Sequence, residues 1–159
     1  MILSLDQALV ETGWAIFDNN KLIAYNSFVI NGKNPIEERL WQLFEQLTDL
    51  YNKYEFDHLI FEDIQQQQNP STYKKLAYVQ AIILLWCYYH NMDYTILSPS
   101  QWRKILGGGF GRSREEQKQK AIAFVKNNYH IDVESDIADA ICIGKAYLNS
   151  NKKIGFGVM

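Results

Sequence analysis

The sequence predicts one α/β domain in which a five-stranded mixed sheet is flanked by helices on both faces. Two observations carry this prediction. Short apolar runs alternate with longer segments of helical periodicity, and their order is three strands first, then helices and strands in turn. A length of 159 residues with 47% hydrophobic content is enough for one core. We expect residues 1–150 to form a single domain and residues 151–159 a C-terminal tail.

The first three strands are predicted to form an antiparallel meander. Apolar runs at Ile2–Leu5, Gly13–Phe17 and Leu22–Ile30 are short and favour β structure. The turn-forming residues Asp18-Asn19-Asn20 separate the last two runs. A helix follows, with Asn34 as the predicted N-cap, and its apolar residues recur every three or four positions as far as Tyr54.

The middle of the chain predicts a buried strand and an unusually apolar helix. His58–Phe61 is apolar and β-favouring, as expected for a central strand. Asn69-Pro70 then predicts the start of a helix that reaches Tyr89 and is apolar on more than one face. Its outer face either lies under a further helix or forms a homodimer interface, and both alternatives remain open.

The last third predicts a strand, a loop, two helices and a tail. Tyr94–Leu97 is the strand, and Pro99–Arg112 is a loop that contains several glycines. Helices are expected at Ser113–Asn127 and at Ser135–Leu148, the second with Ser135 as N-cap and with a loose tail after it.

The cysteines and the length of the apolar runs indicate the cellular location. Cys87 and Cys142 lie in apolar helical segments, which suits buried thiols in a reducing compartment. The longest apolar run, Ala81–Tyr89, is too short to cross a bilayer. We therefore expect a cytoplasmic protein with no membrane partner.

Two predicted strands end in an acidic residue. Asp6 follows the first strand and Glu62 follows the central one. If these strands are parallel neighbours, both carboxylates emerge at the same edge of the sheet, where α/β folds commonly place their sites. The alternative is that each acid simply lies in solvent beyond its strand.

Two more acids lie near the start of the last helix. Asp136 and Asp139 are three residues apart, so both side chains lie on one helix face. An acid in a first turn also offsets the helix dipole, which by itself accounts for one of them. The small and apolar neighbours Ala138, Ala140 and Ile141 indicate a closely packed helix.

Four carboxylates without a His or Cys cluster favour hard cations. We expect Asp6, Glu62, Asp136 and Asp139 to bind Mg²⁺, with Mn²⁺ as a substitute. A pair of such ions would activate water and stabilise the leaving 3′ oxygen in phosphodiester hydrolysis.

The positive charge is concentrated in one segment. Residues 101–128 carry seven basic and two acidic side chains, a net charge of +5 in a chain of net charge −2. A solvated helix face is the alternative explanation. The loop Gly107–Arg112 lacks the spacing of a P-loop, but its amides and Arg112 could approach DNA phosphates.

Several motifs together resemble the RuvC family of Holliday junction resolvases. They are Ile2-Leu3-Ser4-Leu5-Asp6 with Thr12-Gly13-Trp14-Ala15, Phe61-Glu62, Ser98-Pro99-Ser100-Gln101-Trp102-Arg103-Lys104, and Asp136-Ile137-Ala138-Asp139-Ala140. The resemblance implies a ribonuclease-H-like fold, the four acids as metal ligands, a homodimer, and paired nicks at a four-way DNA junction. It also implies that Arg103, Lys104, Arg114 and Lys118 contact DNA.

Two departures from the family pattern indicate a divergent branch. Just after the position of Glu62, bacterial members often have a stacking aromatic residue, whereas this chain has Gln65–Gln68. Asp6-Gln7-Ala8-Leu9 stands where the family commonly has Asp-Pro-Gly. Both resemble the phage-encoded, lactococcal-phage type, which would act in the cytoplasm of a bacterial host.

Two other functions remain compatible with these residues. One is an RNA-processing nuclease of the same fold, which substrate comparison would distinguish. The other is a module that binds branched DNA without cutting it, the acids serving as helix caps and solvated strand ends.

Overall fold

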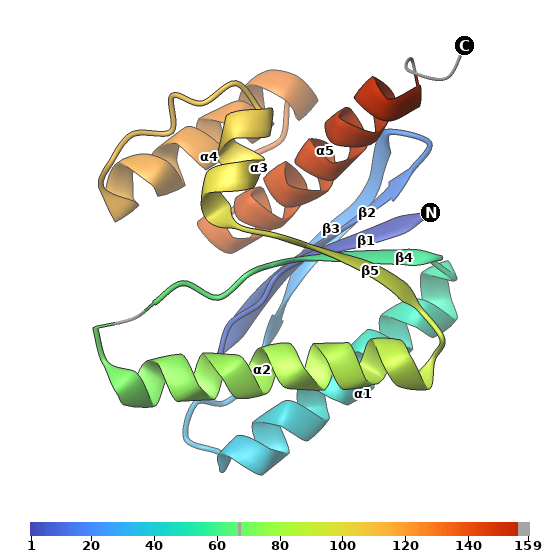
Figure 1. Cartoon of the computed structure of the whole chain (residues 1–159), viewed down its shortest axis with the longest axis vertical. Coiled ribbons are helices and arrows are strands. Elements are labelled where there is room, and N and C mark those ends of the chain that lie inside the picture. Colours follow the sequence, from blue (N-terminus) through green and yellow to red (C-terminus); the bar gives the residue numbers. More distant parts are fainter. Residues whose placement is uncertain (67, 156–159) are drawn as a thin grey trace.

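The computed structural model describes residues 1–66 and 68–155, which form three layers (Figure 1). The elements in chain order are β1 (Ile2–Asp6), β2 (Glu11–Asp18), β3 (Lys21–Val29), α1 (Ile36–Tyr54), β4 (His58–Glu62), α2 (Pro70–Tyr89), β5 (Asp93–Leu97), α3 (Pro99–Ile105), α4 (Arg114–Tyr129) and α5 (Ser135–Gly155). The α/β class and the predicted order of strands are confirmed.

The sheet is mixed and has the strand order β3-β2-β1-β4-β5. β1 to β3 form the predicted antiparallel meander, and β1, β4 and β5 run parallel. β1 and β4 are therefore parallel neighbours at the centre, which is the condition under which Asp6 and Glu62 emerge at the same edge.

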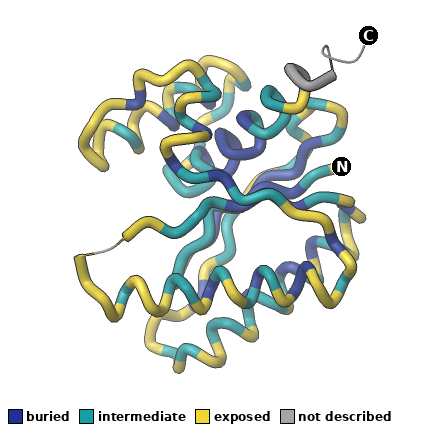
Figure 2. The backbone as a smooth tube through the Cα atoms, in the orientation of Figure 1, coloured by how far each residue is buried: buried dark blue, intermediate teal, exposed yellow. Residues whose placement is uncertain are grey.

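Each face of the sheet has its own core. Helices α1 and α2 cover one face, while α3, α4 and α5 lie on the other (Figure 1). Alternate residues of the strands point to opposite sides, so Leu3 and Leu5 belong to the core under α1 and α2, whereas Ile60 belongs to the core under α5. Strands β1, β2 and β4 and residues 140–144 of α5 are the most deeply buried parts (Figure 2).

Helix ends test the predicted caps. Asn69 caps α2 as expected, its side chain accepting a hydrogen bond from the Ser71 amide at 2.9 Å. Asn34 was the wrong cap for α1, because Pro35 precedes the first helical residue and provides no side-chain bond. In α5 the Glu134 carbonyl accepts the first helical bond from Ala138, so the helix starts at Ser135 instead of being capped by it.

Two segments are more helical than predicted. α3 occupies part of the predicted loop Pro99–Arg112, starting with a capping box between Ser98 and Gln101. α5 continues to Gly155, so the predicted boundary between residues 150 and 151 falls inside a helix. The rest of the predicted tail, residues 156–159, lies outside the described residues.

Both cysteines are buried and unpaired, as predicted. Across residues 1–66 and 68–155, no helix combines the length and the apolar character needed to cross a bilayer.

Candidate active site

The four predicted acids line one pocket of about 610 Å³. β1 and β4 pair in register as far as Leu5 and Phe61, so Asp6 and Glu62 emerge side by side at the carboxyl edge of the sheet. Asp136 and Asp139 reach the same pocket from the start of α5. Residues separated by more than a hundred positions are thereby brought together.

Helix α5 approaches the sheet closely because glycines lie at two of the points where they meet. A Cβ at Gly13 would lie 2.0 Å from the Asp136 carbonyl oxygen, and one at Gly144 would lie 2.4 Å from the Phe17 ring. The buried Ser4 hydroxyl donates to the Ala140 carbonyl at 2.7 Å. This close approach brings the acids of α5 to those of the sheet.

The carboxylates raise one another's pKa values. Burial raises the pKa of Asp6 well above its usual range, and the charges of Asp139, Glu62 and Asp136 raise it further. Burial, Glu62 and Asp136 raise the pKa of Asp139 to about 7. The charge on Arg103 acts in the opposite direction on both groups. A negative site of this kind favours a cation.

Glu62 is held by groups outside the acid set. The Trp102 indole Nε1–H donates to Glu62 Oε2 at 2.6 Å. The Gln7 amide pairs with the Glu62 backbone, its Oε1 accepting from the Glu62 N–H at 3.2 Å and its Nε2 donating to the Glu62 carbonyl. Burial raises the pKa of Glu62, and the Trp102 hydrogen bond lowers it.

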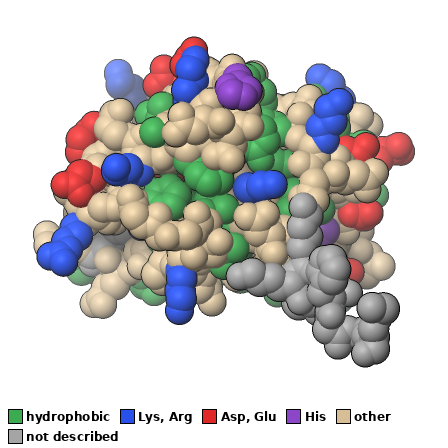
Figure 3. Space-filling model, turned by 90° about the horizontal axis from the view of Figure 1, so that it is seen from above, with side chains coloured by type: hydrophobic (Ala, Val, Ile, Leu, Met, Phe, Trp, Pro, Cys, Tyr) green, Lys and Arg blue, Asp and Glu red, His purple; other side chains and the backbone are tan. Residues whose placement is uncertain are grey.

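The predicted basic residues divide into two groups. Arg103, Arg114 and Lys118 line the same pocket as the acids. Lys104 and Arg112 are exposed and lie outside its lining. On the face that carries α3, α4 and α5, basic side chains stand apart from one another without forming one continuous patch (Figure 3).

The donor set fits a hard divalent cation better than zinc. All four acids offer oxygen atoms, which Mg²⁺ and Mn²⁺ prefer, and their mutual repulsion would fall if a cation lay between them. Among the described residues, no group of three or more His, Cys, Asp or Glu side chains is already arranged around a single point as a metal site.

The sequence-based prediction missed Trp102 and Gln7 as site residues. It placed Trp102 in the loop Pro99–Arg112, because α3 was not predicted. The signal was present in Ser98-Pro99-Ser100-Gln101, which has the spacing of a capping box with proline at the first helical position. No comparable signal points to Gln7, whose partner is 55 residues away.

Comparison with known sequences identifies the family. The model of "Crossover junction endodeoxyribonuclease RuvC" matches residues 2–146. A relative of that name from Ehrlichia ruminantium is 28% identical over 95% of this chain and 98% of its own length. One from Dictyoglomus thermophilum is 26% identical over 93% of this chain and 96% of its own length.

Solved structures support the same fold. Thermus thermophilus RuvC in complex with a Holliday junction substrate matches with a TM-score of 0.78 and 12% identity, covering 96% of this chain and 94% of that one. The yeast mitochondrial Holliday junction resolvase matches with a TM-score of 0.65 and 15% identity, covering 98% and 80%. The ribonuclease-H-like fold is therefore confirmed. With its family model matched over nearly the whole chain, this protein is a nuclease that belongs to the RuvC family of crossover junction endodeoxyribonucleases.

Proposed function

We propose that this chain is a divalent-metal-dependent endonuclease that resolves Holliday junctions by paired nicks. The observation that carries the proposal is the single pocket lined by four acids together with Arg103, Arg114 and Lys118. A site for phosphodiester hydrolysis needs both negative ligands for cations and positive groups for DNA phosphates. The printed names of the relatives, which are crossover junction endodeoxyribonucleases, support junctions as the substrate.

Asp6, Glu62, Asp136 and Asp139 would hold Mg²⁺, with two ions per site and Mn²⁺ as a substitute. Bound metal would supply Lewis acidity and a more acidic water molecule. The chain's own contribution is orientation: two acids are fixed by neighbouring strand ends, and two by a helix packed closely on the sheet. Burial of the carboxylates strengthens their electrostatic interactions.

The basic residues would position the DNA backbone. Arg103 lies next to the acids, close enough to lower the pKa values of Asp6, Glu62 and Asp139. Arg114 and Lys118 lie on the first two turns of α4, at the rim of the same pocket. Lys104 and Arg112 would contact phosphates farther along the strand.

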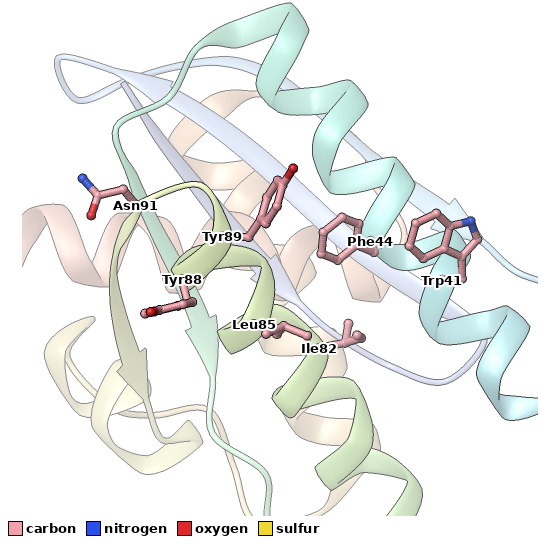
Figure 4. Close-up of a pocket in the computed structure, with 7 residues that line it drawn as sticks. All are labelled: Trp41, Phe44, Ile82, Leu85, Tyr88, Tyr89 and Asn91. Atoms are coloured by element: carbon pink, nitrogen blue, oxygen red, sulfur yellow. The ribbon is translucent and has the colours of Figure 1, made fainter.

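The proposed homodimer would form through α2. Helix α1 covers part of α2, yet Leu85, Tyr88 and Tyr89 remain 55%, 86% and 74% exposed. With Trp41 and Phe44 of α1, these side chains line an apolar hollow of about 830 Å³ (Figure 4). Apolar surface of this extent favours a protein interface. A second copy would place a second nuclease site on the same junction, as paired nicks require.

The phage-encoded branch stays a prediction, and the two sequence relatives named above are from bacteria. The cytoplasm of a bacterial host as the location of this protein depends on the same prediction. Gln7 and the glutamine segment after Glu62 are the features that support it.

A junction-cleavage assay tests the proposed function. Wild type, Asp6→Asn and Asp49→Asn are incubated with a synthetic four-way junction in which each strand is labelled in turn. Asp49 is an exposed acid on α1 and serves as the matched control. We expect Mg²⁺-dependent nicks in two strands of like polarity for wild type and Asp49→Asn, and a loss of about 1,000-fold or more for Asp6→Asn.

Three results would contradict the proposal: cleavage by Asp6→Asn at the wild-type rate, no cleavage in either Mg²⁺ or Mn²⁺, or faster cleavage of a matched RNA branch than of the DNA junction. The last result would favour an RNA-processing enzyme.

A further inference from the structure

The carboxylate of Glu62 has a buried donor directed at it. Trp102 Nε1 lies 2.6 Å from Glu62 Oε2, and the Trp102 side chain is fully buried. The Phe110 ring meets the indole edge-on, with centroids 5.3 Å apart, and the Arg103 guanidinium lies over the indole at 4.8 Å. An indole packed in this way cannot turn its N–H to another acceptor without disturbing its neighbours.

Chain connectivity fixes where this donor lies. Leu97 pairs with Glu62 in the parallel β4–β5 ladder, and the Asp63 amide donates to the Leu97 carbonyl at 2.9 Å. Helix α3 starts two residues later, stabilised by the reciprocal Ser98–Gln101 capping box. The first turn of α3 therefore places Trp102 beside the side chain of Glu62, the residue that pairs with Leu97 at the end of β5.

The backbone of Glu62 is held from the other side. The β1–β4 ladder ends at Leu5 and Phe61, so no further strand residue pairs with Glu62 on that side. The Gln7 side-chain amide takes the place of a backbone amide there, because it donates to the Glu62 carbonyl and accepts from the Glu62 N–H. Gln7 stands where the family commonly has proline, which has no side-chain donor or acceptor.

We propose that Trp102 and Gln7 are positioning residues that fix Glu62 as a metal ligand, Trp102 by holding one carboxylate oxygen and Gln7 by holding the backbone. This inference rests on the proposed function. A carboxylate with one oxygen already hydrogen-bonded presents its other oxygen in a defined direction. Groups that orient a metal ligand in this way contribute strongly to metal affinity and activity.

Two buried tryptophans make a matched experiment. Trp102→Phe keeps an aromatic ring but removes the N–H donor. Trp86→Phe is the control, because Trp86 is equally buried and its Nε1–H donates to the Thr48 hydroxyl at 3.0 Å, on the opposite face of the sheet. The readouts are Mn²⁺ affinity of the protein without DNA, measured by EPR of free Mn²⁺, single-turnover junction cleavage, junction affinity without metal, and melting temperature.

We expect Trp102→Phe to bind Mn²⁺ about 10-fold more weakly and to need about 10-fold more Mn²⁺ for half-maximal cleavage. Junction affinity without metal should stay within about twofold of wild type. Trp86→Phe should lower the melting temperature but leave the Mn²⁺ dependence unchanged. Equal Mn²⁺ affinity and dependence for Trp102→Phe, Trp86→Phe and wild type would overturn the role of Trp102.

Gln7→Met tests the second contact and also covers the case in which Trp102→Phe does not fold. Methionine keeps an unbranched side chain of similar length without the amide. Weaker Mn²⁺ binding by Gln7→Met, with unchanged junction affinity, supports the proposal, and wild-type binding overturns it for Gln7. If wild type neither binds Mn²⁺ nor cuts while folded, the proposed function itself is wrong and the positioning role is overturned with it. The positioning role alone is overturned by a different result. In that case wild type cuts, Asp6→Asn does not, and both Trp102→Phe and Gln7→Met cut as wild type does.

Discussion

The core under α5 and the core under α1 and α2 each contain a fully buried tryptophan, but the two indole N–H groups have different partners. Trp86 donates to the neutral hydroxyl of Thr48, between two helices. Trp102 donates to the Glu62 carboxylate at the edge of the polar pocket. On one face the hydrogen bond joins the two covering helices α1 and α2. On the other face it joins a core residue to Glu62, a proposed metal ligand.

The two faces also differ in the surfaces that they leave exposed. The α1–α2 face presents an apolar hollow lined by aromatic and aliphatic side chains. The α5 side presents a pocket of acids with basic residues at its rim. We propose that this difference reflects two roles, in which one face of the sheet forms the proposed dimer and the other acts on DNA. Variants that alter one face only can test these roles.

The largest effect is expected where α5 meets the sheet. In Gly13→Ala the new Cβ would lie 2.0 Å from the Asp136 carbonyl oxygen, so α5 must move away from β2. We expect the free energy of unfolding to fall by about 3 kcal/mol. Displaced acids should also slow cleavage by about 100-fold. Chemical denaturation and single-turnover cleavage measure the two effects.

Gly32→Ala is the control for this variant, since the nearest atom to its new Cβ is a Val10 methyl carbon at 3.1 Å. A Gly13→Ala protein as stable and as active as Gly32→Ala would show that the close contact with α5 is unnecessary.

Leu85→Glu should weaken the proposed dimer contact on the α1–α2 face. A charge in the apolar hollow would have to be buried in the proposed dimer, so we expect the dimer dissociation constant to rise about 100-fold. Sedimentation velocity over a concentration series measures the change, and Tyr25→Glu, at an exposed position of β3, is the control. Mn²⁺ affinity should not change. A wild-type monomer at micromolar concentration would refute the dimer.

Smaller losses are expected from the basic rim of the pocket. Arg114→Gln and Lys118→Gln should each weaken junction binding about 10-fold at low salt, and each should reduce the salt dependence by about one ion. Lys126→Gln is the control, because Lys126 pairs with Asp132 at 2.8 Å and lies outside the pocket lining. Fluorescence anisotropy across salt concentrations measures both quantities. Equal salt slopes for all three variants would argue against rim contacts with phosphates.

Local signals in the sequence were sufficient for most of the fold. Alternating and continuous apolar runs located all five strands, and Asn69-Pro70 located the start of α2. The placement of Asp6 beside Glu62 at one sheet edge followed from the general behaviour of parallel strands. These features depend on neighbours in the chain or on rules that hold for all α/β sheets.

Other features depend on contacts between distant residues. Gln7 is an ordinary polar residue until β4 places Glu62 beside it. Trp102 was attributed to a loop because α3 has only seven residues, too few for a periodic pattern. Lys104 and Arg112 carry the same charge as Arg103, but only Arg103 lines the pocket. The path of the backbone decides this difference, and the sequence does not show that path.

The smallest effect concerns the charge of the pocket without metal. Burial, Glu62 and Asp136 raise the pKa of Asp139 from 3.8 to about 7, so the folded protein keeps a proton there that the unfolded chain releases near pH 4. The stability that this group contributes is fully present below about pH 4 and is lost as pH rises through about 7.

In Asp139→Asn the group carries no charge at any pH. In metal-free buffer at pH 8 we therefore expect the variant to melt about 3 °C above wild type, or about 1 kcal/mol. The difference should shrink as pH falls below 7 and should nearly vanish only at about pH 4. At pH 8, Mg²⁺ should raise the melting temperature of wild type more than that of the variant. Asp49→Asn should show no such pH dependence, and an Asp139→Asn protein that melts below wild type at pH 8 without metal would show that the pocket carries no repulsion for a cation to relieve.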